Sequence, residues 1–199
     1  MPFKTPPTLR SCGLALAAVA ALTLSAAPAV WAQSGATPPP AASKAEDDSK
    51  LDRSDRKMLQ DLAQGNMAEV DAGKMALEKS QNADVKKFAQ QMVDDHGKAL
   101  GEVQALATAK NVTLPDGPGA MAKTKAIALK AMSGSLFDKE YAKRAGVGDH
   151  ESTVKLLQKM QKDGKDSDLK ALAGKMLPTV EHHLEMAREL AASASAAKS

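Results

Sequence analysis

Three of the four histidines of this chain occupy positions on apolar helical faces, where a leucine would be the usual residue. His96 lies four residues after Met92, with further apolar residues four and seven positions later. His150 and His183 repeat the pattern, with a valine three residues before each and apolar residues four and seven after it. His182 has charged neighbours at helical spacing, so it is predicted to face solvent.

A carboxylate occupies the equivalent place on a fourth segment. Leu62 and Ala76 lie seven residues before and after Glu69, which puts Glu69 on the apolar stripe of that segment. One carboxylate beside three imidazoles suits Zn, Fe, Mn or Cu better than Ca or Mg. The candidate metal ligands are therefore Glu69, His96, His150 and His183.

The same four residues also fit a structural role, as a buried hydrogen-bonded cluster that fixes the packing register. Asp95 and Asp149 directly precede His96 and His150. Adjacent helical residues point about 100° apart, so these aspartates are not expected to bind the same ion. They are expected to be solvated, with a supporting hydrogen bond to a ligand as the alternative.

Four long amphipathic helices must carry these residues. The apolar periodicity predicts them over residues 54–80, 84–110, 135–162 and 167–192, with Ser54 as the first N-cap and Pro178 inside the last helix. Short turns between the first two and the last two make each pair antiparallel. The long crossover, residues 111–134, is expected to hold a short helix over 120–132. The prediction is an all-α four-helix bundle of two helical hairpins.

The spacing also predicts that the four polar groups share one level of the bundle. Glu69 and His96 lie about 12 and 14 residues from the turn between their helices, a mismatch of ~3 Å at 1.5 Å per residue. His150 and His183 lie about 14 and 17 residues from theirs, a mismatch of ~5 Å. All four side chains can therefore converge near the middle of the bundle.

The first 32 residues are typical of a signal peptide. Lys4 and Arg10 precede an uncharged run over residues 13–30, and cleavage is expected after Ala32. The alternative is an uncleaved anchor helix. Cleavage removes Cys12, the only cysteine, so the mature chain would lack a thiolate nucleophile or thiolate ligand.

Residues 33–52 are predicted to be a disordered linker and residues 193–199 a disordered tail, which leaves 53–192 as the bundle domain. The formal net charge of +3 falls to about +1 when Lys4 and Arg10 are lost, so nucleic-acid binding is not expected. No second apolar run is long enough to span a bilayer. The expected location is the periplasm, or otherwise outside the cytoplasm.

Three segments together resemble a known bacterial family. They read GNMAEVDAGKMALEKSQNADVKKFAQQMVDDHGKAL, FDKEYAKRAGVGDH and LKALAGKMLPTVEHHLEMA, within residues 53–190. The family is the domain of unknown function numbered 4142, whose members are ferritin-like exported proteins sometimes labelled outer-membrane proteins. The resemblance implies a ferritin-like bundle and export. Di-iron bundles carry Glu-x-x-His on two helices, and this chain has no such motif, which argues against a two-iron oxidase.

Two functions remain open from the sequence. The first is an exported protein that binds one transition-metal ion at mid-bundle. The second is a non-enzymatic envelope module for stress tolerance or for binding an envelope protein, in which the buried cluster is structural. The sequence carries no phosphate loop after a strand, no nucleophile elbow and no HExxH motif, so it favours a protein that is not an enzyme.

Overall fold

The computed structural model describes residues 49–196, and in that range it contains helices and no β-strand. The predicted all-α class is therefore confirmed. The expected signal peptide and most of the expected linker lie outside the described residues, as do residues 197–199. None of the described helices combines the length and apolar character that a membrane span requires.

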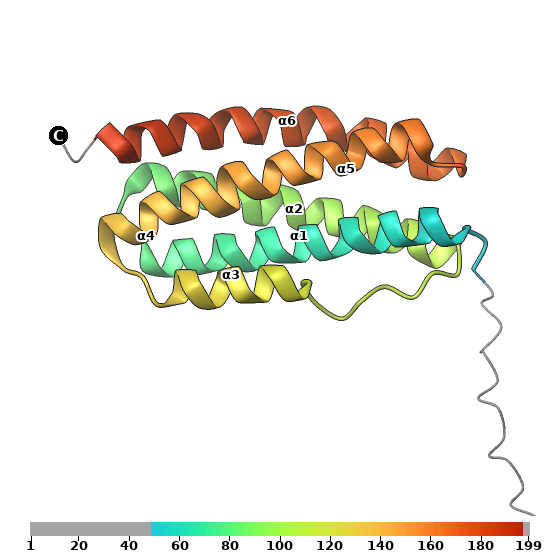
Figure 1. Cartoon of the computed structure of the whole chain (residues 1–199), viewed down its shortest axis with the longest axis horizontal. Helices are drawn as coiled ribbons and strands as arrows, with labels where there is room; N and C mark the ends of the chain where they lie inside the picture. Colours follow the sequence, from blue (N-terminus) through green and yellow to red (C-terminus); the bar gives the residue numbers. More distant parts are fainter. Residues whose placement is uncertain (1–48, 197–199) are drawn as a thin grey trace, which may run out of the picture. The chain divides into compact units, whose positions relative to one another are not determined.

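The first hairpin consists of α1 (Arg53–Lys79) and α2 (Ala83–Ala109), which run side by side (Figure 1). Asp52 is the N-cap of α1, and its carboxylate accepts a hydrogen bond from the Asp55 N–H at 2.8 Å. The prediction of Ser54 as the cap is therefore wrong, because the aspartate two residues earlier reaches that amide. Asn82 caps α2 in the same way.

The second hairpin departs from the expected pair of regular helices. The segment predicted as one helix consists of α4 (Gly134–Tyr141), a π-helix η1 (Ala142–Asp149) and α5 (His150–Asp163), end to end. A π-helix pairs each N–H with a carbonyl five residues earlier, which apolar periodicity does not indicate. The return helix α6 (Ser167–Ala196) runs through Pro178 and continues past the expected end at residue 192.

The crossover carries α3 (Ala120–Lys130), which lies along α1 (Figure 1) and agrees with the short helix expected there. Asn111 follows the end of α2 with a φ of 54°. Asn tolerates this left-handed conformation better than most residues, so it is well suited to end a helix.

The apolar core forms two clusters, and the boundary between them falls at the predicted polar residues. On α2, Met92 belongs to one cluster and Val103 to the other, with His96 between them. On α6, Val180 and Ala187 are divided in the same way around His183. Glu69 and His150 also lie between members of the two clusters along the chain. The polar groups therefore form a layer between the two apolar clusters.

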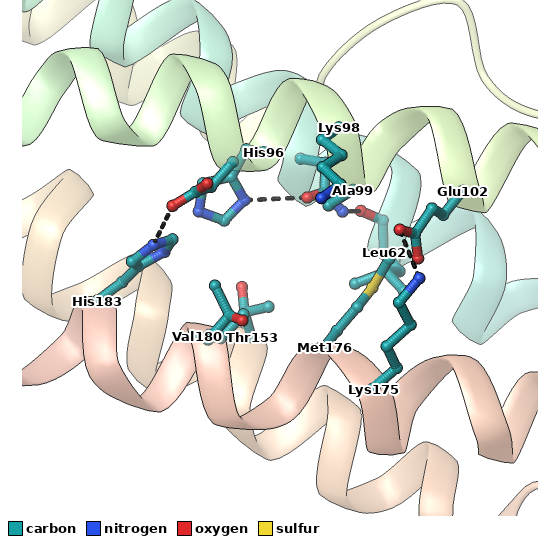
Figure 2. Close-up of a pocket in the computed structure, with 13 residues that line it drawn as sticks. Leu62, His96, Lys98, Ala99, Glu102, Thr153, Lys175, Met176, Val180 and His183 are labelled. Atoms are coloured by element: carbon teal, nitrogen blue, oxygen red, sulfur yellow. Dashed lines mark hydrogen bonds and ion pairs between the residues drawn. The ribbon is translucent and has the colours of Figure 1, made fainter.

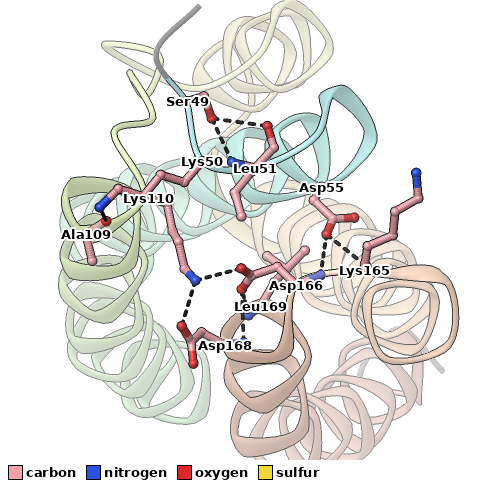
Figure 3. Close-up of polar contacts among 10 residues, drawn as sticks. All are labelled: Ser49, Lys50, Leu51, Asp55, Ala109, Lys110, Lys165, Asp166, Asp168 and Leu169. Atoms are coloured by element: carbon pink, nitrogen blue, oxygen red, sulfur yellow. Dashed lines mark hydrogen bonds and ion pairs between the residues drawn. The ribbon is translucent and has the colours of Figure 1, made fainter.

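Polar contacts at one end of the bundle connect the two hairpins (Figure 3). The buried Asp55 carboxylate, on α1, accepts hydrogen bonds from the backbone N–H groups of Lys165 and Asp166 at 2.8 and 2.7 Å. Lys110, at the end of α2, pairs with Asp166 and Asp168 at 2.6 and 2.7 Å. The first hairpin thus holds the turn between α5 and α6 in place. These contacts fix the level of α5 and α6 relative to α1 and α2.

Candidate metal centre

Three of the four predicted ligands converge. One ring nitrogen each from His96 on α2, His150 on α5 and His183 on α6 lies within 4.8 Å of the other two. All three side chains are buried. The cluster therefore has the composition and the spacing of a site that could hold one metal ion.

The protonation pattern of His96 follows from Asn66. The side-chain nitrogen of Asn66 donates to the Leu62 carbonyl at 2.8 Å, so its oxygen must face the other way. That oxygen lies 2.9 Å from His96 Nδ1. Because an amide oxygen only accepts, His96 Nδ1 carries the hydrogen, and in the neutral ring Nε2 is left with a lone pair.

His150 is oriented by the π-helix. Its Nδ1 lies 3.2 Å from the carbonyl oxygen of Ala145, five residues earlier, so Nδ1 is again the donor. Its Nε2 lies 3.3 Å from His96 Nε2. Two neutral rings protonated on Nδ1 would therefore point lone pairs at each other. A cation or a shared proton between the two nitrogens would relieve this repulsion.

His183 supplies a third bare nitrogen. Its Nε2 lies 2.9 Å from Asp95 Oδ2, and because a carboxylate accepts, Nε2 carries the hydrogen. Its Nδ1 is buried and has no hydrogen-bond partner among residues 49–196. Each ring therefore uses one nitrogen to bond an acceptor and keeps the other free of hydrogen.

Glu69, the fourth predicted ligand, is buried but does not belong to the group of converging ligand atoms. Its Oε1 lies 3.6 Å from His150 Nδ1, the nitrogen on the opposite side of the ring from His96. Burial is the main cause that raises the pKa of Glu69 well above its usual value, with Asp149 adding to the effect and Lys125 opposing it. The spacing argument gave the level of Glu69 and could not tell on which side of His150 it lies.

Burial also keeps the three imidazoles neutral. It is the largest cause that lowers the pKa of His96 to about 3 and that of His150 to about 4. Burial lowers the pKa of His183 as well, although Asp95 opposes this effect. At neutral pH the rings are therefore in the form that offers a lone pair to a metal.

A pocket of about 140 Å³ adjoins the cluster (Figure 2). Its lining includes His96 and His183 but not His150. Lys175 on α6 reaches Glu102 on α2 with an N–O distance of 2.7 Å, and both line the pocket. The cluster is thus approached from one side, between α2 and α6.

Two members of the site were not among the predicted ligands. Asn66 lies four residues after Leu62 and three before Glu69, so its place on the apolar stripe of α1 was a signal in the sequence. For Asp95 the sequence offered a supporting hydrogen bond to a ligand only as the alternative to solvation, and the structure shows that bond, with His183 on another helix. Asp149, the other aspartate next to a cluster histidine, forms an ion pair with Lys125 on α3.

A family model described as a domain of unknown function, DUF4142, matches residues 40–190. The comparison with curated proteins gave no match.

Several solved structures resemble this one. CopM in its Cu(II)-bound form has 15% identity and a TM-score of 0.59 over 70% of this chain and 96% of that one. CopM in its Cu(I)-bound form has 14% identity and a TM-score of 0.56 over 68% and 93%. A DUF305 fragment from Deinococcus radiodurans has 12% identity and a TM-score of 0.64 over 72% and 98%. At these identities the likeness shows a shared helical fold.

Proposed function

Because this chain belongs to the DUF4142 family, whose description names no activity, we propose its function from the site itself: it is an exported protein that binds one transition-metal ion. The ligands are His96 Nε2, His150 Nε2 and His183 Nδ1. The observation that carries the proposal is that one nitrogen of each ring converges with the other two, while each ring bonds an acceptor through one nitrogen and keeps its second nitrogen free of hydrogen.

The distances suit such an ion. Two imidazole nitrogens at about 2.0–2.1 Å from a tetrahedral metal lie roughly 3.3 Å apart. The separation of His96 and His150 is already 3.3 Å. The largest separation in the group is within 4.8 Å, so a small inward movement completes the set. Three protein ligands leave one coordination position open.

The surroundings of the rings support the same proposal. Metal-binding histidines usually donate their second N–H to a carboxylate, a backbone carbonyl or another acceptor, which fixes the ring orientation. Here the acceptors are Asn66, the Ala145 carbonyl and Asp95. We assign Glu69 to this outer set beside His150, in place of the direct ligand role expected from the sequence.

Copper is the first ion to test, with zinc as the second. Neutral imidazole suits both, and CopM, which shares the helical fold, has been solved with Cu(I) and Cu(II). Iron and manganese are less favoured, because the group has no carboxylate among its converging atoms. The expected signal peptide at residues 1–32 would place this chemistry in the periplasm.

The test is metal analysis of untagged protein purified without chelator. Wild type is expected to retain about one equivalent of Cu or Zn and His96→Ala to lose it. His182→Ala is the matched control, because His182 is exposed and next to the cluster in sequence. No bound metal, and no rise in melting temperature when Cu(II) or Zn(II) is added, would favour the structural module instead.

The variant Glu69→Gln tests whether Glu69 supports His150 or binds the metal directly. The amide keeps the shape of the side chain but cannot ionise. If Glu69 lies behind His150, the variant still binds one equivalent with reduced affinity. Loss of the metal at saturating concentration would instead make Glu69 a ligand.

A further inference from the structure

We propose that the site takes up and releases its ion through the pocket between α2 and α6, and that Asp95 sets the rate by holding His183 in place. The inference rests on the proposed function. It adds the route of exchange and a positioning residue that acts through His183.

The three histidines differ in how firmly they are held. His96 bonds Asn66 and His150 bonds the carbonyl of Ala145, and both acceptor residues are buried. The side chain of Asp95 is 39% exposed, so water competes for the hydrogen bond that orients His183. Of the three rings, His183 is therefore the one whose support is most easily broken from outside.

The pocket between α2 and α6 lies on the side of the cluster where Asp95 and His183 are, and both residues line it. It reaches His96 and His183, while His150 does not line it. Its walls come mainly from α2 and α6, which belong to different hairpins and are joined by no turn. The ion pair between Lys175 and Glu102 connects these two helices beside the pocket (Figure 2). Its members are 67% and 27% exposed, and exposed pairs of this kind are weak.

A second cavity lies beside Glu69, and its lining includes none of the three cluster histidines. Its lining includes Glu69, Lys125 and Ser152. Glu69 faces His150 Nδ1, the nitrogen that donates to Ala145, whereas the bare Nε2 faces His96. An ion arriving there would meet a ring N–H. The two cavities therefore give two routes that can be tested against each other.

The first experiment measures metal release. Protein loaded with Cu(II), and separately with Zn(II), is mixed with excess EDTA in a stopped-flow instrument. Asp95→Asn is expected to release the ion about tenfold faster or more at unchanged stoichiometry. An effect of this size is typical when a metal ligand loses its hydrogen-bond partner. Asp94→Asn makes the same charge change one residue away on an exposed side chain, and its rate should equal that of wild type. Asp95→Glu should restore most of the slow release.

The second experiment blocks each cavity in turn. Thr179 is exposed and lines the pocket between α2 and α6, and Ser152 is exposed and lines the cavity beside Glu69. Thr179→Trp is expected to slow both uptake and release severalfold, while Ser152→Trp leaves both rates unchanged. Both variants should still bind one equivalent.

The outcomes separate the two proposals. If wild type binds one ion but Ser152→Trp is the slow variant, or neither variant is slow, the route is wrong and the metal site stands. Equal release from Asp95→Asn and Asp94→Asn overturns the role of Asp95. A wild-type protein that binds neither ion overturns the proposed function and this inference with it.

Discussion

At the scale of single residues, the two nitrogens of each histidine have different tasks. The clearest case is Asn66, whose amide orientation is fixed by the Leu62 carbonyl and which therefore fixes the hydrogen on His96. Asn66 therefore has a role beyond packing. It determines which nitrogen of His96 faces His150 with a lone pair.

We predict that Asn66→Ala lowers metal affinity about 10–100-fold, because His96 loses the acceptor that orients it. The variant should also lose about 1–3 kcal/mol of stability, since a buried N–H is left unpaired. Competition titration with a chromophoric chelator measures the first and urea denaturation of the metal-free protein the second. Gln90→Ala, which removes an exposed amide on α2, should change neither, and equal affinities for the two variants would contradict the role of Asn66.

Sequence reasoning reached the cluster histidines because their positions relative to apolar neighbours reveal an inward direction on each helix separately. It could not place Glu69 behind His150 or pair Asp95 with His183. Those relations depend on how two helices are rotated against each other, and a pattern along one helix carries no such information. The assignment of Glu69, His96, His150 and His183 as metal ligands remains a prediction.

At the scale of elements, glycine shows how closely α1 and α2 approach. A Cβ at Gly73 would lie 2.8 Å from Val93 Cγ2 and 2.9 Å from the carbonyl oxygen of Ala89, both on α2. At Gly101, within α2, nothing lies within 4 Å of the added atom. The same substitution therefore has opposite expected effects at the two positions.

We predict that Gly73→Ala destabilises the protein by about 1–3 kcal/mol, because the backbone of α2 has to move away. Gly101→Ala should stabilise it by roughly 0.5–1 kcal/mol, the ordinary gain of Ala over Gly in a helix. Urea denaturation of the metal-free proteins gives both values. If Gly73→Ala is as stable as Gly101→Ala, the close contact between the two helices does not exist in solution.

Apolar periodicity predicted the long helices because each buries one stripe against the others. It gave no sign of the π-helix η1, since the buried residues Ala142, Ala145 and Gly146 also fit a regular helix. Yet this segment brings the Ala145 carbonyl to His150. π-helical turns are often found at functional sites, and here the irregular turn adjoins the candidate ligand itself.

At the scale of the whole molecule, the site requires the two hairpins to hold a fixed relation, because its histidines come from both. The contact between Asp55 and the turn before α6 provides part of that relation at one end of the bundle. Asp55 was not singled out from the sequence, since its partners are backbone groups 110 and 111 residues away.

We predict that Asp55→Ala lowers stability by about 1.5–3 kcal/mol, because two hydrogen bonds to a charged acceptor are lost. Asp61→Ala, which removes an exposed pair with Lys57 on the same helix, should cost no more than about 0.5 kcal/mol. Both can be read from thermal and urea unfolding. Equal losses would mean that the Asp55 contact does not hold the hairpins together.

The bond between Asp95 and His183 joins α2 to α6, whereas His150 is supported by a main-chain carbonyl in its own segment. Every residue type at position 145 has a main-chain carbonyl, so the bond to His150 does not depend on which side chain is there. The bond between Asp95 and His183 depends on both side chains. Across the DUF4142 family, replacements at these two positions should therefore occur together, leaving a correlated pair of alignment columns where α2 and α6, the second long helix of each hairpin, meet.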